Sequence, residues 1–250
     1  MKGCWCALWM LWCQLVSAAP VLNIYADSYP PFIQVNGESL SGPYVDVFAR
    51  LAQQQGIEVD FQSKPMRRLL KIVATEPNSC GLGVHFSAEN AETLRYVARI
   101  APITLAVYSR QGTVPQLSNI ETLRNYRVGA IDVAELRELL DNAVIHYKLL
   151  PKASQGIAML QAGRFELLIS DVLPELVTAS AQGKQVQRVM VLARVERWLA
   201  CHPQLPANIL KQLRASLTLG VFDHSMADIW KHYGLSSAYE GVRREWIVVP

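Results

Sequence analysis

The chain contains 250 residues, of which 51% are hydrophobic and 18% charged, and its formal net charge is +3. This length fits one large domain or two domains of about 110 residues each. The hydrophobic fraction is sufficient for a packed core and argues against intrinsic disorder. A charge this small and scattered does not indicate a nucleic-acid partner, which requires a concentrated basic face. Because the only long apolar run lies near the N-terminus, a polytopic membrane protein is excluded.

Residues 1–18 have the charged, apolar and small-residue order of a secretory signal peptide. The apolar run from Cys4 to Val16 is interrupted by Gln14 and is shorter than the ~20 residues of a membrane-spanning helix. We therefore expect cleavage after Ala18 and export to the periplasm. An uncleaved signal anchor is the alternative.

Two cysteines, Cys80 and Cys201, lie beyond the expected signal peptide. An even number of cysteines in an oxidising compartment permits one disulfide bond. The alternative is two separately buried thiols that act as small apolar residues. Both alternatives stay open, because a sequence alone does not bring two Cα atoms within bonding reach.

The first half of the chain alternates short apolar strands with amphipathic helices. Gly56 ends the first helix, and the dipeptide Asn36-Gly37 is typical of a tight turn. Gly81-Leu82-Gly83 is interpreted as a packing feature within a strand. This alternation predicts a parallel sheet with helical crossovers. We expect strands at 21–26, 57–62 and 81–86, with helices at 44–52 and 66–74.

The same alternation recurs after a long expected strand at 103–109. Asp132 and Glu135 have the spacing of a capping box at the start of a helix that reaches Leu140. We expect further strands at 127–131, 165–170 and 188–198, with helices at 119–125, 157–161, 206–219 and 225–233.

These elements predict two α/β lobes, the second inserted within the first. Residues 19–108 and 195–250 form the first lobe, and residues 109–194 form the second. The two connections are strands rather than loose loops, which suits a hinge between the lobes.

Searches for catalytic and metal-binding patterns find little. The chain contains no G-x-S-x-G, H-E-x-x-H or Gly-rich phosphate-binding pattern. His224 and His232 share an expected helix but stand two turns apart, too far to bind one metal ion. We therefore expect no metal and no cofactor.

Polar and aromatic residues cluster in the loops that follow the expected strands. Ligands of open parallel α/β sheets bind at the carboxyl ends of the strands. An alternative for Tyr29 and Phe32 is that their rings only cover the edge of the core. The candidate ligand-binding residues from this placement are Tyr29, Phe32, Tyr44, Arg67, Arg68, His85, Phe86, Ser87 and Asp171.

Several short segments, in order, resemble the extracellular solute-binding proteins of family 3, which are the amino-acid-type periplasmic receptors of ABC importers. The resemblance covers nearly all of the mature chain. The matching segments include Tyr29-Pro30-Pro31-Phe32, Gly42-x-Tyr44-x-Asp46, Pro65-x-x-Arg68, Ser87-Ala88-Glu89, Arg127-Val128-Gly129 and Ala162-Gly163-Arg164.

The resemblance implies the type II periplasmic-binding-protein fold, with two α/β lobes that close on a small molecule. It also implies a monomer without enzymatic activity, with an ABC permease in the inner membrane as a partner.

Two positions depart from the family pattern. Asn90 stands where the family usually has an arginine that grips the carboxylate of the ligand. Asp132 stands at a helix start where backbone N–H groups usually receive that carboxylate, and as the N-cap it would occupy them. The sequence therefore predicts a divergent member whose ligand is a cationic or neutral solute rather than a free α-amino acid.

Two other function classes stay open beside an importer receptor. One is a sensor, or a receptor without a transport partner, with the same fold. The other is a dehydratase-like enzyme of this fold, in which Glu89 or Glu166 would be the general acid.

Overall fold

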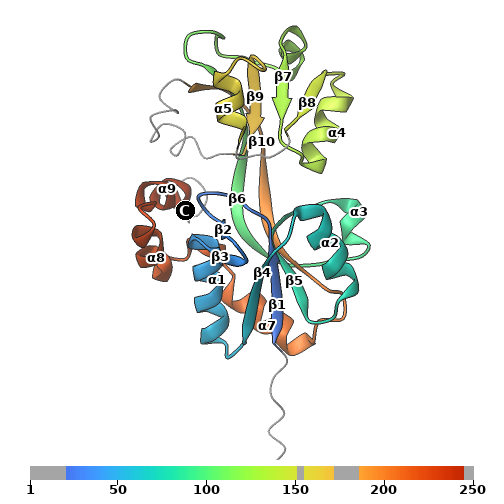
Figure 1. The fold of residues 1–250 in the computed structure, drawn as a ribbon, viewed down its shortest axis with the longest axis vertical. Helices are drawn as coiled ribbons and strands as arrows, with labels where there is room; N and C mark the ends of the chain where they lie inside the picture. Colours follow the sequence, from blue (N-terminus) through green and yellow to red (C-terminus); the bar gives the residue numbers. More distant parts are fainter. Residues whose placement is uncertain (1–20, 151–154, 172–185, 245–250) are drawn as a thin grey trace, which may run out of the picture.

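The computed structural model describes residues 21–150, 155–171 and 186–244; the expected signal peptide lies outside the described residues. Figure 1 shows two α/β lobes connected by two long strands, β6 (Arg95–Arg110) and β10 (Val186–Cys201). One eight-stranded sheet runs through both lobes in the order β4-β1-β5-β10-β6-β9-β7-β8. The predicted α/β architecture of two lobes joined by two strands is therefore present.

Lobe 1 is the lower lobe in Figure 1, and its sheet is parallel where β1 pairs with β4 and with β5. Its central strands are buried on both sides, as expected for a sheet covered by helices. The elements of lobe 1 are β1 (Leu22–Ala26), β2 (Gln34–Asn36), β3 (Ser39–Ser41), α1 (Pro43–Gln54), β4 (Val59–Ser63), α2 (Met66–Thr75), β5 (Ser79–His85), α3 (Ala88–Ala91), α7 (Ala207–Ser216), η4 (Gly220–Phe222), η5 (His224–Met226), α8 (Ala227–His232) and α9 (Ser236–Val242).

Helix α1 fixes the loop that leads from β1 towards the space between the lobes. The helix starts with Pro43, whose fixed φ angle suits the first helical position. Gly42 before it has a φ angle of 116°, and a Cβ atom there would lie 2.4 Å from the Phe32 carbonyl oxygen. The same carbonyl oxygen accepts a hydrogen bond from the Tyr44 N–H. Loop 29–33 is therefore held against the start of α1, and the Pro30–Pro31 peptide bond in it is cis.

Lobe 2 is the upper lobe in Figure 1, and β7 pairs in parallel with both β8 and β9. Its buried side chains form a hydrophobic cluster separate from the main cluster of lobe 1. The elements of lobe 2 are η1 (Ile120–Asn125), β7 (Val128–Ala130), α4 (Ala134–Asn142), β8 (Tyr147–Leu149), α5 (Gly156–Gln161) and β9 (Leu167–Ser170).

The two long strands pair antiparallel along their whole length, from Val186 opposite Arg110 to Cys201 opposite Arg95. The register shifts at several points, as at β-bulges, which bend a strand and increase its twist. The predicted lobe boundaries, at residues 108/109 and 194/195, both fall inside these strands. The exact boundaries stay a proposal.

Two expected elements differ from those observed, and one short strand was not expected. Strand β6 begins at Arg95 rather than at residue 103, because exposed arginines at positions 95 and 99 alternate with buried residues and mask its start. The segment at 119–125 is a 3₁₀ helix, η1, instead of an α-helix, and the Asn119 side chain accepts a hydrogen bond from the Thr122 N–H at its start. Strand β8 was not expected, because only three residues form it.

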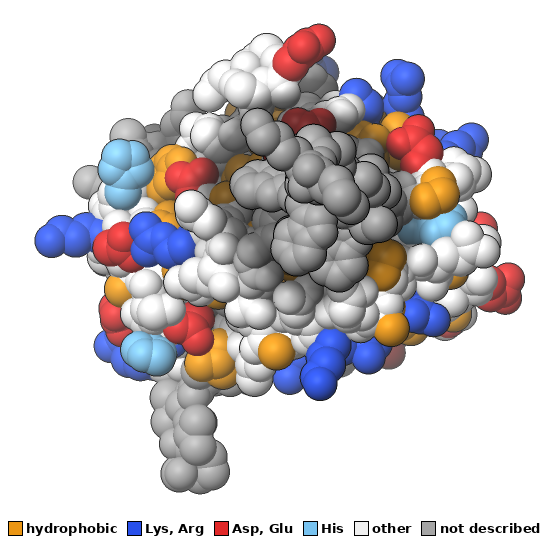
Figure 2. Space-filling model, turned by 90° about the horizontal axis from the view of Figure 1, so that it is seen from below, with side chains coloured by type: hydrophobic (Ala, Val, Ile, Leu, Met, Phe, Trp, Pro, Cys, Tyr) orange, Lys and Arg blue, Asp and Glu red, His pale blue; other side chains and the backbone are white. Residues whose placement is uncertain are grey.

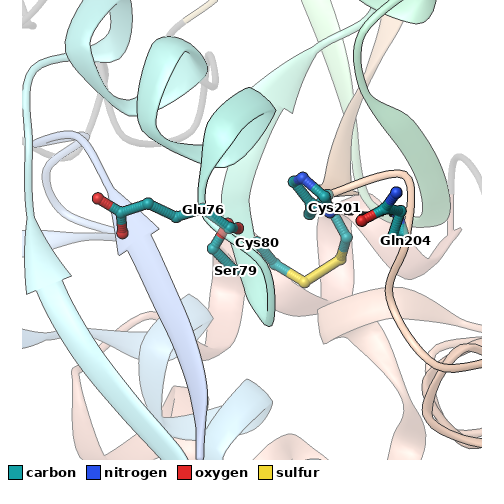
Figure 3. The surroundings of a disulfide bond; sticks show 6 residues. Glu76, Ser79, Cys80, Cys201 and Gln204 are labelled. Atoms are coloured by element: carbon teal, nitrogen blue, oxygen red, sulfur yellow. Dashed lines mark hydrogen bonds between the residues drawn. A yellow bond between two sulfur atoms is a disulfide. The ribbon is translucent and has the colours of Figure 1, made fainter.

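Cys80 and Cys201 form a disulfide bond, which settles the alternatives left open by the sequence. The two residues lie opposite each other in the antiparallel pair of β5 and β10. Figure 3 shows the bond next to Ser79, the first residue of β5, whose hydroxyl group donates to the Glu76 carbonyl oxygen. The bond ties the end of the second connecting strand to the centre of the lobe 1 sheet.

The charged side chains on the face shown in Figure 2 are mixed in sign, with basic groups interspersed among acidic ones. Among the described residues, no helix has the length and apolar character needed to cross a membrane.

We expect reduction of the Cys80–Cys201 bond to lower the free energy of unfolding by about 2–5 kcal/mol. The bond closes a loop with a sequence separation of 121 residues, so it removes much conformational freedom from the unfolded chain. Urea unfolding with and without a reductant measures the change. A double variant with Cys80→Ala and Cys201→Ala is the control, because reductant should not destabilise it further. Equal stabilities of the oxidised and reduced wild-type protein would contradict the prediction.

Candidate ligand-binding cleft

A cleft of about 700 Å³ lies between the two lobes. Side chains from both lobes line it, as expected for a site at the carboxyl ends of parallel strands. The polar and aromatic lining residues are Asp27, Ser28, Tyr29, Arg67, His85, Phe86, Ser87, Asn90, Asp132, Arg137, Asp171 and Arg197.

Arg197 is the buried cation at the floor of the cleft. It lies on β10 opposite His85 of β5, and its side chain is only 8% exposed. Its Nη2 atom donates to Asp171 Oδ2 at 2.5 Å, and its Nη1 atom donates to the Gly83 carbonyl oxygen at 2.9 Å. Gly83 has a φ angle of 78°, in the left-handed region that favours glycine. A packing role was predicted for both Gly81 and Gly83. Gly81 has this role, since a Cβ atom there would lie 2.6 Å from Leu69.

Tyr29 completes the contacts around this guanidinium group. The Cζ atom of Arg197 lies 3.6 Å from the centroid of the Tyr29 ring, within the range of a cation–π interaction. The Tyr29 hydroxyl group donates to the backbone carbonyl oxygen of Asp171 at 3.1 Å. Asp171 follows β9 of lobe 2, whereas Tyr29 follows β1 of lobe 1. The cluster of Tyr29, Asp171 and Arg197 therefore connects the two lobes.

Burial and neighbouring charges change the pKa values in this cluster. Burial acts to lower the pKa of Arg197, but Tyr29 and Asp171 act in the opposite direction, and the pKa lies above its usual value. Burial, followed by the charge of Asp171, raises the pKa of Tyr29. The cluster therefore holds a charged guanidinium group and a protonated phenol at neutral pH.

Three buried polar atoms of the cleft have no hydrogen-bond partner in the described part of the chain. They are His85 Nδ1, Asp171 Oδ1 and Arg197 Nε. His85 as a whole is partly exposed, but its Nδ1 atom is shielded from solvent. Burial and the charge of Arg197 lower the pKa of His85 to about 3, with Asp171 opposing them, so its imidazole ring is neutral. Buried groups of this kind offer hydrogen bonds that a ligand can make.

Asp132 lies at the rim of the cleft between two arginines. Its Oδ1 atom is 3.3 Å from Arg137 Nε on α4, and its Oδ2 atom is 3.5 Å from Arg67 Nη2 on α2 of lobe 1. The expectation that Asp132 is the N-cap of the following helix is wrong. Helix α4 starts at Ala134 with Val133 as N-cap, and among the described side chains none caps it. The capping-box partner Glu135 has a side chain outside the described part.

The other polar residues of lobe 1 in the cleft are held by local hydrogen bonds. Asp27 Oδ2 accepts from the Met66 N–H at 2.8 Å and so satisfies a donor at the start of α2. The Ser87 hydroxyl group accepts from the Asn90 N–H at 3.1 Å and caps the short helix α3. Both Ser87 and Asn90 line the cleft, as expected from the sequence.

Three of the expected ligand-binding residues do not line the cleft. Phe32 and Tyr44 are 1% and 2% exposed, and their rings pack against each other at 5.1 Å and against Trp230. The alternative that the Phe32 ring belongs to the core edge is therefore the correct one. Arg68 is exposed and lies on the side of α2 away from the cleft lining. The sequence wrongly predicted these two rings and Arg68 as ligand-binding residues. The position of a residue along the chain does not fix the direction of its side chain.

The exposed aromatic surface of the cleft comes from Phe86, which is 45% exposed. Its ring centroid lies 4.9 Å from that of Tyr96, which in turn lies 6.0 Å from that of Trp198. Phe86 therefore lines the cleft at the end of a row of packed aromatic rings.

Arg197 and Arg137 line the cleft, but they were not among the ligand-binding residues predicted from the sequence. The available signal for Arg197 was an arginine followed by a run of apolar strand residues, Trp198 to Cys201. Such a position suggests a buried charge that needs a partner. Nothing in the sequence shows that the partner is Asp171.

The proposed general acids of an enzyme lie outside the cleft. Glu89 is exposed on α3, and Glu166 accepts a hydrogen bond from the Arg127 N–H at 3.0 Å on the surface of lobe 2. Among the described residues, no group of histidine, cysteine or acidic side chains could hold a metal ion. The dehydratase hypothesis therefore loses both of its candidate residues.

No protein-family model and no curated protein sequence matches the chain. Solved structures match well. A histidine kinase sensor domain with similarity to periplasmic binding proteins has a TM-score of 0.69 at 17% identity, covering 92% of this chain and 96% of that one. The GluR0 ligand-binding core in complex with L-glutamate has a TM-score of 0.72 at 13% identity, covering 86% and 99%. ArtJ, the arginine-, lysine-, histidine-binding protein of Geobacillus stearothermophilus, has a TM-score of 0.70 at 14% identity, covering 86% and 95%.

The chain has the fold of the type II periplasmic binding proteins, as predicted. The three structures named here are a sensor domain, a ligand-binding core and an amino-acid-binding protein. At identities of 13–17%, the likeness to these structures concerns the fold.

We expect the protein to lose up to about 2 kcal/mol of stability between pH 7 and pH 5 through His85. The folded state keeps this ring neutral down to pH 3, whereas the ring in the unfolded chain takes up a proton below about pH 6.5. Falling pH therefore favours the unfolded state across this window. Urea unfolding at both pH values measures the loss, and His85→Gln should reduce it. His146→Gln, at an exposed position, is the matched control; equal pH dependence in all three proteins would reject the prediction.

We expect Phe32→Ala to lower the free energy of unfolding by about 3–5 kcal/mol, the usual cost of removing a core ring. Phe86→Ala should cost less than about 1 kcal/mol, because that ring is almost half exposed. Thermal and urea unfolding of the two variants compares them directly. A stability of Phe32→Ala equal to that of Phe86→Ala would show that Phe32 lies outside the core.

Proposed function

We propose that the protein is a periplasmic solute-binding protein that captures a small polar molecule by closing its two lobes, and that it serves an ABC-type importer. The observation that carries the proposal is the cleft of about 700 Å³, which both lobes line and two long strands bridge. A cleft of this size suits a small molecule. Closure about connecting strands is a common way for a two-lobed protein to enclose a ligand.

The proposed ligand lies against the ring of Phe86, which replaces Tyr29 and Phe32 as the expected aromatic platform. The face of Tyr29 is covered by Arg197, and Phe32 lies in the core. A stacked aromatic contact contributes about 0.5–1.5 kcal/mol beyond the burial of area. The neutral ring of His85 offers a hydrogen bond on the same wall.

The charges of the cleft support a ligand other than a free α-amino acid. The described lining residues include three arginines and three aspartates, so their formal charges cancel. Arg197 is paired with Asp171, and both Arg67 and Arg137 lie within salt-bridge distance of Asp132. Asn90 lines the cleft where a charged partner for a carboxylate would be expected. A carboxylate entering this cleft would have to break an existing pair.

A sensor role is the second candidate function. The observation in its favour is the match to a sensor domain of a histidine kinase, which covers 92% of this chain. An importer receptor binds a permease, whereas a sensor passes closure on to a signalling partner. A pull-down with the products of neighbouring permease genes separates the two roles.

Native mass spectrometry of the purified protein, followed by a thermal-shift screen of small polar solutes, tests the binding role. We expect a bound molecule that raises the melting temperature without being converted. Phe86→Ala should weaken its affinity several-fold, while Val144→Ala, at an exposed position outside the cleft, should leave it unchanged. Turnover of the molecule, or the absence of any binder, would reject the proposal.

We expect none of the twenty free amino acids to bind with submicromolar affinity, because all three cleft arginines already have acidic partners. Loss of a charge-assisted pair worth about 1.5–3 kcal/mol weakens binding by at least tenfold. Titration calorimetry of each amino acid measures the affinities. One submicromolar binder with a free α-carboxylate contradicts this expectation and leaves the binding role intact.

A further inference from the structure

The guanidinium group of Arg197 makes the contacts that a small organic cation would make in a receptor. It has a carboxylate partner in Asp171 at 2.5 Å, a carbonyl partner in Gly83 at 2.9 Å, and the face of the Tyr29 ring at 3.6 Å. Carboxylates, carbonyl oxygens and aromatic faces are the groups that bind ammonium and guanidinium ligands. Arg197 thus occupies a complete cation-binding subsite.

The parts of this subsite come from both lobes and meet in the cleft. Asp171 follows β9 in lobe 2, while Gly83 and Tyr29 belong to lobe 1. Every one of these residues, and Arg197 itself, lines the cleft. The group therefore lies where a ligand would be enclosed, with Tyr29 at the edge of the lobe 1 core.

The ion pair between Arg197 and Asp171 does not use all of the hydrogen-bonding atoms of the two side chains. Within the described part of the chain, Asp171 Oδ1 and Arg197 Nε are buried and have no hydrogen-bond partner. The Arg50–Asp228 pair on the surface is different, because both carboxylate oxygens of Asp228 accept from Arg50. Arg197 therefore holds Asp171 through one oxygen and shields the other, whereas a free guanidinium ion in its place could donate to both oxygens.

We propose that Arg197 is a built-in occupant of a cation subsite formed by Asp171, the Gly83 carbonyl group and the Tyr29 ring. As a result, the wild-type cleft takes no ammonium or guanidinium group at Asp171, and its ligand is uncharged at that end. Removal of the Arg197 side chain opens the subsite to small guanidinium compounds. This inference rests on the proposed function in treating the cleft as the ligand site.

Chemical rescue of Arg197→Ala tests the proposal. The variant should melt at a lower temperature than the wild type, because Asp171 is left buried without its cation. Methylguanidinium at about 10 mM, far below denaturing concentrations, should raise the melting temperature of the variant by about 3 °C and saturate. Equal concentrations of sodium chloride and of urea, which has a similar shape and no charge, should have no effect.

Three control proteins accompany the rescue. The wild type should not respond to methylguanidinium, because its subsite is filled. Arg50→Ala, which removes an exposed arginine that is also paired with an aspartate, should not respond either. The double variant Asp171→Asn with Arg197→Ala should lose the response, because the carboxylate is then absent.

A folded Arg197→Ala variant that shows no saturable response overturns the proposal. So does an equal response in the wild type or in Arg50→Ala. If the variant does not fold alone, the yield on refolding with and without methylguanidinium becomes the measurement, and an unchanged yield overturns the proposal.

The rescue experiment does not use the natural ligand. The proposed cation subsite and the proposed solute-binding function can therefore be rejected independently of each other. A failed rescue with a positive solute screen rejects the subsite alone. A successful rescue with an empty solute screen supports the subsite and rejects the natural binding role.

Discussion

The contact on which the cleft depends is the buried ion pair between Arg197 and Asp171. It connects a strand of the hinge in lobe 1 to the end of a strand in lobe 2. Both side chains are almost fully buried, and removing one partner of such a pair typically costs about 3–5 kcal/mol. Tyr29 contacts both residues, and the Gly83 carbonyl oxygen accepts from Arg197. Burial and the charge of Arg197 keep His85 neutral. The position of Arg197 therefore determines the charge environment at the floor of the cleft.

The pairing of charges is the basis of the proposal that the ligand is not a free amino acid. A receptor for a zwitterion needs a free cation for the carboxylate and a free anion for the ammonium group. Here Asp171 already has a guanidinium partner, and Asp132 lies between two arginines at the rim. The type II fold does not by itself decide the ligand, because function lies in the site rather than in the fold.

The hinge and the disulfide bond constrain the same part of the molecule. Strand β10 carries Arg197 in the cleft and ends four residues later at Cys201, which is bonded to Cys80 of β5. Because β5 also contributes Gly83 and His85, the bond holds the lobe 1 side of the cleft in register with the connecting strand.

The sequence determined the local elements and their nesting, because apolar periodicity and turn residues act over a few positions. The strands near residues 22, 59, 79 and 167 follow from such patterns. The bond between Cys80 and Cys201 does not, because it joins residues 121 positions apart and the sequence left the pairing open. The sequence could not decide which side chains face the cleft: Phe32 and Tyr44 are core residues, and Asp132 pairs with arginines instead of capping a helix. The meeting of Asp171 with Arg197 was decided by the tertiary structure alone, since it depends on how two lobes pack across a hinge and no local pattern encodes that distance.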